Sequence, residues 1–270
     1  MKGRFQFWKL YDGHILEGQT RFLVYLRHLR EYLMLYAGLA LLGIACLSWA
    51  LVAFPLNLLF KGARGIWIGR RVANLWFYFY LSVLRLSGAA HFDLRALDTL
   101  RGAGSLIIAA NHPGLLDAPM VLSRLPNVAC VLKSSLIDSV FWGAAARLAG
   151  YIRNDWFIGS VKLAVEELQR GGQILVFPEG TRTEGKSLGE FRLGPAYVSS
   201  RSGFPIQTIL IEQDTNFLGK GQPLLKRPDL PMHFRIRLGK RFDSPEDPRT
   251  FTITLRDYFE SELHAASLGA

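Results

Sequence analysis

A histidine and an aspartate flanking a turn sequence are the first residues whose types and spacing suggest chemistry. His112 and Asp117 belong to the segment Asn-His-Pro-Gly-Leu-Leu-Asp, which follows an apolar stretch, 105–110, predicted as a buried strand. Proline and glycine favour a turn, so Asp117, at the predicted start of a helix, can fold back onto His112. A carboxylate on one imidazole nitrogen leaves the other nitrogen to act as a base. The segment fits a dyad that deprotonates a hydroxyl, and it equally fits a turn-capping histidine beside a helix-capping aspartate.

A second group of polar residues follows another apolar stretch, 173–177, also predicted as a strand. The sequence Phe-Pro-Glu-Gly-Thr-Arg ends at Arg182 and places a carboxylate, a flexible glycine, a hydroxyl and a guanidinium at one strand end. A guanidinium beside the amides of Gly180 and Thr181 suits a phosphate or another compact anion. The alternative is a surface loop with a solvated arginine.

The elements that must position these residues alternate along the chain from residue 90 onward. Short apolar runs alternate with amphipathic stretches, which predicts an α/β fold with a mostly parallel central sheet flanked by helices. We expect strands at 105–110, 127–132, 173–177, 205–211 and 232–238. We expect helices ending near residue 149, at 161–169, at 195–202 and after residue 247. Both polar segments then lie at strand ends, where the sites of such sheets are found.

The N-terminal third has a different composition and predicts a membrane anchor. A run of 29 residues without charge, 32–60, is long enough for a helix that crosses a bilayer, and Pro55 should bend that helix near residue 53. A second apolar run, 72–84, has only 13 uncharged residues and is rich in aromatic side chains. Arginines and lysines flank the long run on both sides. We therefore favour a hairpin or re-entrant anchor, with 72–84 as the returning limb, over a single span.

Charge and cysteine content restrict the class of protein. The net charge is +10, of which residues 1–90 contribute 11 − 3 = +8 and residues 91–270 contribute 21 − 19 = +2. Basic residues beside an apolar run indicate attraction to anionic lipid headgroups, and they lack the clustered pattern of a nucleic-acid-binding surface. The two cysteines, Cys46 and Cys130, form neither a disulfide framework nor a metal-ligand spacing. We expect no metal and no nucleic-acid partner.

The two polar segments together identify a resemblance. H-x4-D followed about sixty residues later by F-P-E-G-T-R resembles the glycerolipid acyltransferases of the lysophosphatidic acid acyltransferase type. The likeness covers roughly residues 85–215. It is supported by four further segments: Val131-Leu132-Lys133, Gly150-Tyr151-Ile152-Arg153, Phe191 to Ala196 and Gly203 to Ile206.

The resemblance implies roles for individual residues. His112 would be the general base toward the acceptor hydroxyl, and Asp117 would orient and polarise it. Arg182 would hold the acceptor's phosphate. The other positions implied in acceptor or phosphate binding are Glu179, Gly180, Thr181, Lys133 and Arg153. Arg153 follows Gly150 by three positions, where many relatives have a longer spacer.

The resemblance also implies the reaction and the division of the chain. An acyl thioester, acyl-CoA or acyl carrier protein, would give its acyl group to a lysophospholipid, by default 1-acylglycerol-3-phosphate, without a cofactor. Other lysolipids, such as lyso-ornithine lipid, are alternative acceptors. Residues 85–270 would form a glycerol-phosphate-acyltransferase-like catalytic domain. The anchor, about residues 32–84 within a basic region 1–84, would hold it at a membrane, on the cytoplasmic face of a bacterial inner membrane.

Two other classes remain as alternatives. A membrane-associated hydrolase could use the same His-Asp pair to activate water, although the sequence has no G-x-S-x-G, H-E-x-x-H or Walker A pattern. A non-catalytic lipid-binding protein could retain the fold, although such a protein is expected to have lost His112, Asp117 or Glu179.

Overall fold

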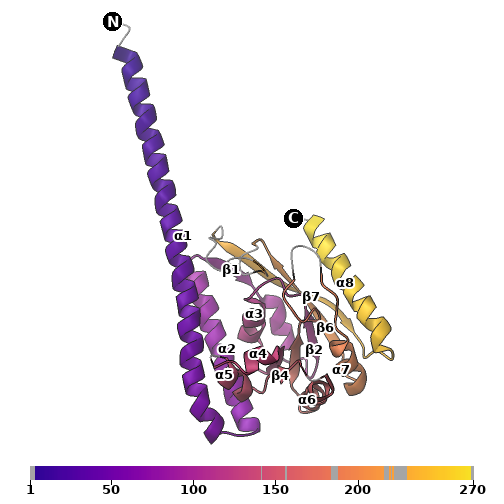
Figure 1. Cartoon of the computed structure of the whole chain (residues 1–270). Coiled ribbons are helices and arrows are strands. Elements are labelled where there is room, and N and C mark those ends of the chain that lie inside the picture. Colours follow the sequence, from indigo (N-terminus) through magenta and orange to yellow (C-terminus); the bar gives the residue numbers. More distant parts are fainter. Residues whose placement is uncertain are drawn as a thin grey trace.

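A long N-terminal helix leans against an α/β domain (Figure 1). The computed structural model describes residues 4–140, 142–155, 157–183, 188–215, 219, 221 and 230–268, with side chains described between residues 24 and 265 of these. Helix α1 covers Arg4–Leu59 and helix α2 covers Ala63–Leu86, and a short turn joins them into an antiparallel pair.

The described strands form one seven-stranded sheet of order β1-β7-β6-β2-β5-β3-β4. All neighbouring strands run parallel except β6 and β7, which are antiparallel. This arrangement confirms the predicted mostly parallel sheet. The bounds are β1 Ala90–Asp93, β2 Ile107–Ala110, β3 Val128–Leu132, β4 Ile152–Arg153, β5 Gln173–Val176, β6 Ile206–Gln213 and β7 Met232–Phe242.

Helices cover both faces of the sheet, as an unbroken apolar strand requires. All four residues of β2 are buried, and they alternate between two cores. Ile108 packs in the core that includes Leu84 and Met120 from α2 and α3, whereas Ile107 packs in the core that includes Phe259 from α8. The remaining helices are α3 Asp117–Arg124, α4 Ser134–Ile137, α5 Gly143–Leu148, α6 Phe157–Gln169, α7 Gly194–Ser202, α8 Pro248–Leu268 and the 3-10 helix η1 Arg95–Leu100.

The N-terminal helices differ from the sequence prediction in two respects. Helix α1 begins far before residue 32 and continues through Pro55 to Leu59 instead of ending near residue 53. Contacts with α5 hold this last turn, since Ala53 is fully buried and Asn57 Nδ2 donates to the Ala144 carbonyl at 2.7 Å. Among the described helices, one segment, Val24–Leu59, is long and apolar enough to cross a membrane by length and composition.

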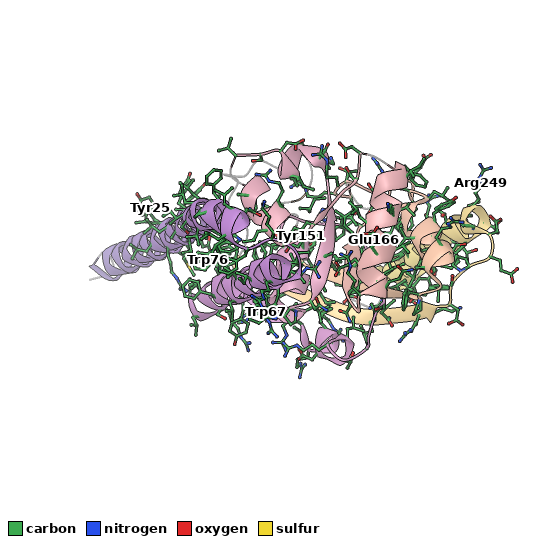
Figure 2. All side chains as sticks on the ribbon, turned by 90° about the horizontal axis from the view of Figure 1, so that it is seen from below. Tyr25, Trp67, Trp76, Tyr151, Glu166 and Arg249 are labelled. Carbon is green, nitrogen blue, oxygen red and sulfur yellow. The ribbon has the colours of Figure 1, made fainter. Side chains whose placement is uncertain are left out.

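The second limb, α2, is an amphipathic helix that packs on the α/β domain. Its buried side includes Ala73, Tyr80 and Leu84, whereas Trp67 and Leu75 are exposed. Seen from the end in Figure 2, Trp67 lies on the side of the molecule away from Arg249 in α8. The two helices thus form an antiparallel pair, and one face of the second helix is covered by protein.

The strand and helix predictions from residue 90 onward mostly match the structure within a few residues. The helix expected to end near residue 149 is two short helices, α4 and α5, and the helix expected at 161–169 begins earlier, at Phe157. The edge strands β1 and β4 were not predicted. β4 has only two residues, and β1, unlike the equally short β2 and β5, includes a histidine and an aspartate in place of a continuous apolar run.

Candidate active site

Three parallel strands at the centre of the sheet bring the polar segments together. His112 follows β2, Glu179 follows β5, and the two strands are direct neighbours with Ala109 opposite Val176. On the other side of β2 lies β6. The buried Asn111 side chain exchanges two hydrogen bonds with the backbone of Ile211, at 2.9 and 2.8 Å. This pair of hydrogen bonds fixes the start of the His112 loop against β6.

His112 and Asp117 form a hydrogen-bonded pair. The Nδ1 atom of His112 lies 2.7 Å from Oδ2 of Asp117, and the same Oδ2 accepts the Gly114 backbone N–H at 2.8 Å. Asp117 is fully buried, whereas 20% of the His112 side chain is exposed. The hydrogen bonds described for the Asp117 side chain go to His112 and Gly114, and the N-cap position of α3 is Leu116. The geometry favours the dyad over the capping explanation.

The environment of Asp117 opposes and supports its charge at the same time. Burial raises the pKa of Asp117 above its ordinary value of 3.8. The hydrogen bond and charge of His112, the Gly114 N–H and the charge of Arg182 act in the opposite direction. The positive charge of Arg182 thus acts on the buried carboxylate of the dyad.

The His112 ring stacks on Phe177, a contact that sequence reasoning missed. The ring centroids are 4.0 Å apart and the planes differ by 18°. Phe177 is the residue directly after β5. Its position beside His112 therefore follows only from the pairing of β2 with β5. The stack restrains the imidazole on one face while Asp117 holds one ring nitrogen.

Glu179 ties three loops together. Its Oε1 accepts hydrogen bonds from the Thr183 hydroxyl at 2.8 Å and from the His112 backbone N–H at 3.4 Å, and its Oε2 accepts the Gly189 N–H at 3.0 Å. The Thr183 N–H in turn donates to the His112 carbonyl at 2.7 Å. The carboxylate is buried, so its contacts are those of a group that positions the loops.

Gly180 allows a second guanidinium to approach the loop. Its φ is 66°, a conformation that favours glycine, and a Cβ there would overlap the side chain of Arg192. Thr181 and Arg182 follow it and are partly buried. Arg182 and Arg192 thus place two cations at the same loop, which suits a compact anion. The sequence analysis included Arg192 in the segment from Phe191 to Ala196 but gave it no role in binding.

The two other cations expected at the site lie farther along the same edge. Lys133 is exposed and follows β3 directly. Arg153 ends β4, the edge strand, and its guanidinium is paired with Asp138 at 2.8 Å and with Asp155 at 2.9 Å. With neighbouring strands about 4.8 Å apart, β4 lies about 14 Å from β2. The structure does not bring Arg153 to the dyad.

A small apolar pocket lies between the N-terminal hairpin and the α/β domain. Leu116, the residue before Asp117, lines it together with Met34, Leu35 and Leu39 of α1 and with Tyr80 and Leu84 of α2. Side chains of the N-terminal hairpin thus reach the same loop that carries the dyad. No group of three side chains suited to hold a metal ion occurs among the described residues.

A second His-Asp pair provides a contrast. His233 Nδ1 lies 2.7 Å from Asp214 Oδ2, the same distance as in the first pair, and the His91 ring is 5.2 Å away. The side chains of His233 and Asp214 are 57% and 50% exposed. The pair lacks the buried carboxylate and the aromatic stack of the first pair.

Comparisons with known proteins agree with the sequence resemblance. The family model described as Acyltransferase matches residues 91–212, a range that contains both polar segments. A lyso-ornithine lipid O-acyltransferase of Pseudomonas aeruginosa is 28% identical and the match covers 76% of this chain and 77% of the relative. Two 1-acyl-sn-glycerol-3-phosphate acyltransferases are each 25% identical. One is a second Pseudomonas aeruginosa protein, and its match covers 52% of this chain and 56% of the relative. The other is the beta protein of Homo sapiens, and its match covers 67% of this chain and 66% of the relative.

A solved structure has the same fold. The crystal structure of the 1-acyl-sn-glycerophosphate (LPA) acyltransferase PlsC from Thermotoga maritima superposes with a TM-score of 0.68 at 15% identity. The superposition covers 89% of this chain and 98% of the other. At this identity the likeness shows the shared fold.

Proposed function

Because the chain belongs to the glycerolipid acyltransferases of the lysophosphatidic acid acyltransferase type, we propose that it acylates the hydroxyl of a lysolipid. The donor is an acyl thioester, acyl-CoA or acyl carrier protein, and the acceptor that the motifs favour is 1-acylglycerol-3-phosphate. The observation that carries the proposal is the 2.7 Å hydrogen bond between His112 Nδ1 and the fully buried Asp117 carboxylate.

The mechanism uses Nε2 of His112, the ring nitrogen that does not contact Asp117. Asp117 keeps the proton of His112 on Nδ1, so Nε2 accepts the proton of the lysolipid hydroxyl as the oxygen attacks the thioester carbonyl. The tetrahedral intermediate collapses, the carbon–sulfur bond breaks, and the imidazolium returns the proton to the leaving thiolate. A thioester carbonyl is already electrophilic, so positioning and one base are sufficient and no covalent enzyme intermediate is needed.

The surroundings of the dyad suit an amphiphilic acceptor. Arg182 and Arg192 offer two guanidinium groups to a phosphate, and apolar side chains of α1 and α2 lie around Leu116, the residue before Asp117. Glu179, although expected to bind the acceptor, supports this site by holding the loops. Lys133 remains a candidate for the acyl donor or acceptor headgroup at the outer part of the edge.

A lyso-ornithine lipid is the second candidate acceptor. One observation favours it: the relative matched over three quarters of the chain is a lyso-ornithine lipid O-acyltransferase. The pairing of Arg153 with two carboxylates also leaves one fewer cation for a phosphate than the motifs predict. An ornithine headgroup carries a carboxylate, which a single guanidinium can bind.

We also propose that the hairpin anchors the enzyme at a membrane, on the cytoplasmic face of a bacterial inner membrane. Support comes from the apolar length of Val24–Leu59 and from exposed apolar side chains along the pair of helices, among them Leu47, Leu51, Trp67 and Leu75. Residues 85–270 carry the catalytic groups, and residues 1–84 hold them beside the lipid substrate. The basic hairpin turn would contact anionic headgroups.

The test is a transfer assay with purified protein in detergent. Acyl-CoA and acyl carrier protein thioesters are each offered with lysophosphatidate, lyso-ornithine lipid and other lysolipids, and the products are identified by mass spectrometry. The proposal expects an acylated lysolipid and little free fatty acid. Equal release of free acid with and without a lysolipid would identify a hydrolase instead.

The dyad is tested by His112→Ala, with His233→Ala as a matched control. Loss of a positioned base costs about 10²- to 10⁴-fold in rate, so His112→Ala should lose nearly all transfer at an unchanged melting temperature. His233 also pairs with an aspartate at 2.7 Å but lies outside the dyad, so His233→Ala should keep most activity. Full activity of His112→Ala would show that another group acts as the base and would contradict the role proposed for the dyad.

A further inference from the structure

Two buried oxygen atoms beside the dyad lack a hydrogen-bond donor. Oδ2 of Asp117 has two donors, but Oδ1 of the same carboxylate has none among the described residues. Oε1 of Gln213, the last residue of β6, is likewise buried and without a donor in that part of the chain. Leaving a buried acceptor unsatisfied costs about 1–3 kcal/mol, and more for a charged group.

Both oxygen atoms lie against the same residue, Gly114. A Cβ built on Gly114 would be 3.1 Å from Gln213 Oε1, 3.8 Å from Gln213 Nε2 and 3.7 Å from Asp117 Oδ1. The missing side chain of Gly114 therefore lets the carboxamide and the carboxylate both approach the same point. The glycine of the Pro-Gly turn thus has a packing role that the sequence did not indicate.

The two ends of a carboxamide have nearly the same shape, so a half-turn about its last bond exchanges the acceptor for a donor. Two acceptors facing each other repel, whereas an amide N–H facing a carboxylate forms a charge-assisted hydrogen bond. Such a donor favours the ionised form of a carboxylate that is otherwise disfavoured by burial. The exchange would turn an N–H of Gln213 toward the side on which Asp117 Oδ1 lacks a donor among the described residues.

We propose that Gln213 is a positioning residue of the dyad, whose side-chain amide donates to Asp117 Oδ1 and keeps that carboxylate ionised and aligned with His112. The inference rests on the proposed acyl transfer. Gln213 is held in place by the same contacts that fix the loop, because Asn111 clamps the backbone of Ile211 two residues before it. It lies outside both polar segments of the sequence and comes to the dyad through the pairing of β2 with β6.

The first variant is Gln213→Met, which keeps the length of the side chain but cannot donate. We expect kcat to fall about tenfold, KM for donor and acceptor to stay within twofold, and the acid limb of the kcat/KM profile to move to higher pH. The sign follows because loss of a donor raises the pKa of Asp117, and the active dyad needs this group ionised.

Gln207→Met is the matched control, since Gln207 is a buried glutamine at the other end of the same strand. Its amide donates to the carbonyls of Thr208 and Gly239, away from the dyad. The control should lower the melting temperature and leave the pH profile unchanged. An identical pH profile for Gln213→Met and wild type would overturn the proposal.

A double-mutant cycle with Asp117→Asn asks whether Gln213 acts through Asp117. Gln213→Met should change kcat less than twofold in the Asp117→Asn background, against about tenfold in wild type. Equal effects in both backgrounds would show a role independent of the carboxylate and would contradict the proposal.

A measurement that does not depend on enzymatic activity separates this inference from the acyltransferase proposal. Carbon-13 NMR of aspartate-labelled protein, with the signal assigned through Asp117→Asn, follows the titration of the Asp117 carboxyl. Its midpoint should rise by about one pH unit in Gln213→Met and stay constant in Gln207→Met. A shifted midpoint in a protein that acylates no lysolipid would retain the Gln213 contact and reject the proposed function, and an unshifted midpoint would reject the contact.

Discussion

At the residue scale, Asp117 is a buried charge that the fold maintains for the site. Its pKa is raised by burial, so the carboxyl binds a proton more readily in the folded chain than in the unfolded one. The stabilising contribution of such a group is present below its unfolded value of 3.8 and is lost as the pH rises through the higher folded value. At neutral pH the ionised carboxylate therefore lowers the free energy of unfolding.

Asp117→Asn should exchange activity for stability. An asparagine keeps one oxygen for His112 and Gly114 and replaces the buried charge by a neutral amide. We expect transfer activity to fall at least about 100-fold, while the free energy of unfolding at pH 7 rises by about 1 kcal/mol. Urea unfolding in detergent between pH 4 and 8 measures this, and the gain should shrink toward pH 4. A variant less stable than wild type across the whole range would contradict the sign.

At the scale of elements, α2 is fixed to the α/β domain by a close contact and a buried ion pair. A Cβ on Gly69 would lie 2.6 Å from the backbone nitrogen of Ala149. The adjacent Arg70 is buried, lies 2.5 Å from Glu167 and donates to the Ala149 carbonyl at 2.9 Å. Because Tyr80 and Leu84 of the same helix line the pocket beside Leu116, the position of α2 bears on the site.

Gly69→Ala should loosen this docking. The added methyl group meets backbone atoms, which cannot move aside as a side-chain tip can, so we expect a loss of about 1–3 kcal/mol of stability. Gly43→Ala is the control, because nothing lies within 4 Å of a Cβ at Gly43 in α1 and alanine favours a helix by up to about 1 kcal/mol. Thermal unfolding of the two variants should move in opposite directions. Equal melting temperatures would mean that α2 does not depend on this contact.

At the scale of the whole molecule, apolar surface and positive charge are concentrated on one side. The hairpin lies on the side of the molecule opposite α8 in both views (Figures 1 and 2). Residues 1–90 carry 8 of the 10 net positive charges. Side chains of the same two helices also contact Leu116, the residue before Asp117, around a small apolar pocket. A membrane on this side would place lipid substrates next to the site.

Leu51→Glu should weaken binding to vesicles that contain anionic lipid. Leu51 in α1 is 69% exposed and Ile253 in α8 is 63% exposed, so Ile253→Glu adds the same charge at equal exposure on the far side. A charge in an apolar membrane face costs about 2–3 kcal/mol, which lowers the partition coefficient by tenfold or more. Flotation of vesicles measures it. Similar losses for both variants would contradict the assignment of the hairpin as the anchor.

Short-range sequence patterns determined the turn between His112 and Asp117 and the parallel type of the sheet. The Pro-Gly turn between His112 and Asp117 holds them within hydrogen-bond distance, as the five-residue spacing suggested, because such a turn is decided by a few adjacent residues. The parallel sheet was also predictable, because continuous apolar runs such as β2 and β6 must be covered on both faces.

Only the tertiary structure decided which distant residues meet the dyad. Phe177 and Gln213 reach it because β5 and β6 are the two neighbours of β2, and strand order is not encoded in any local pattern. The same order places Arg153 on the edge strand, away from His112, although its motif is shared. Helix α1 continues past Pro55 because it packs against α5. Contacts between these distant segments outweigh the local preference of a single proline.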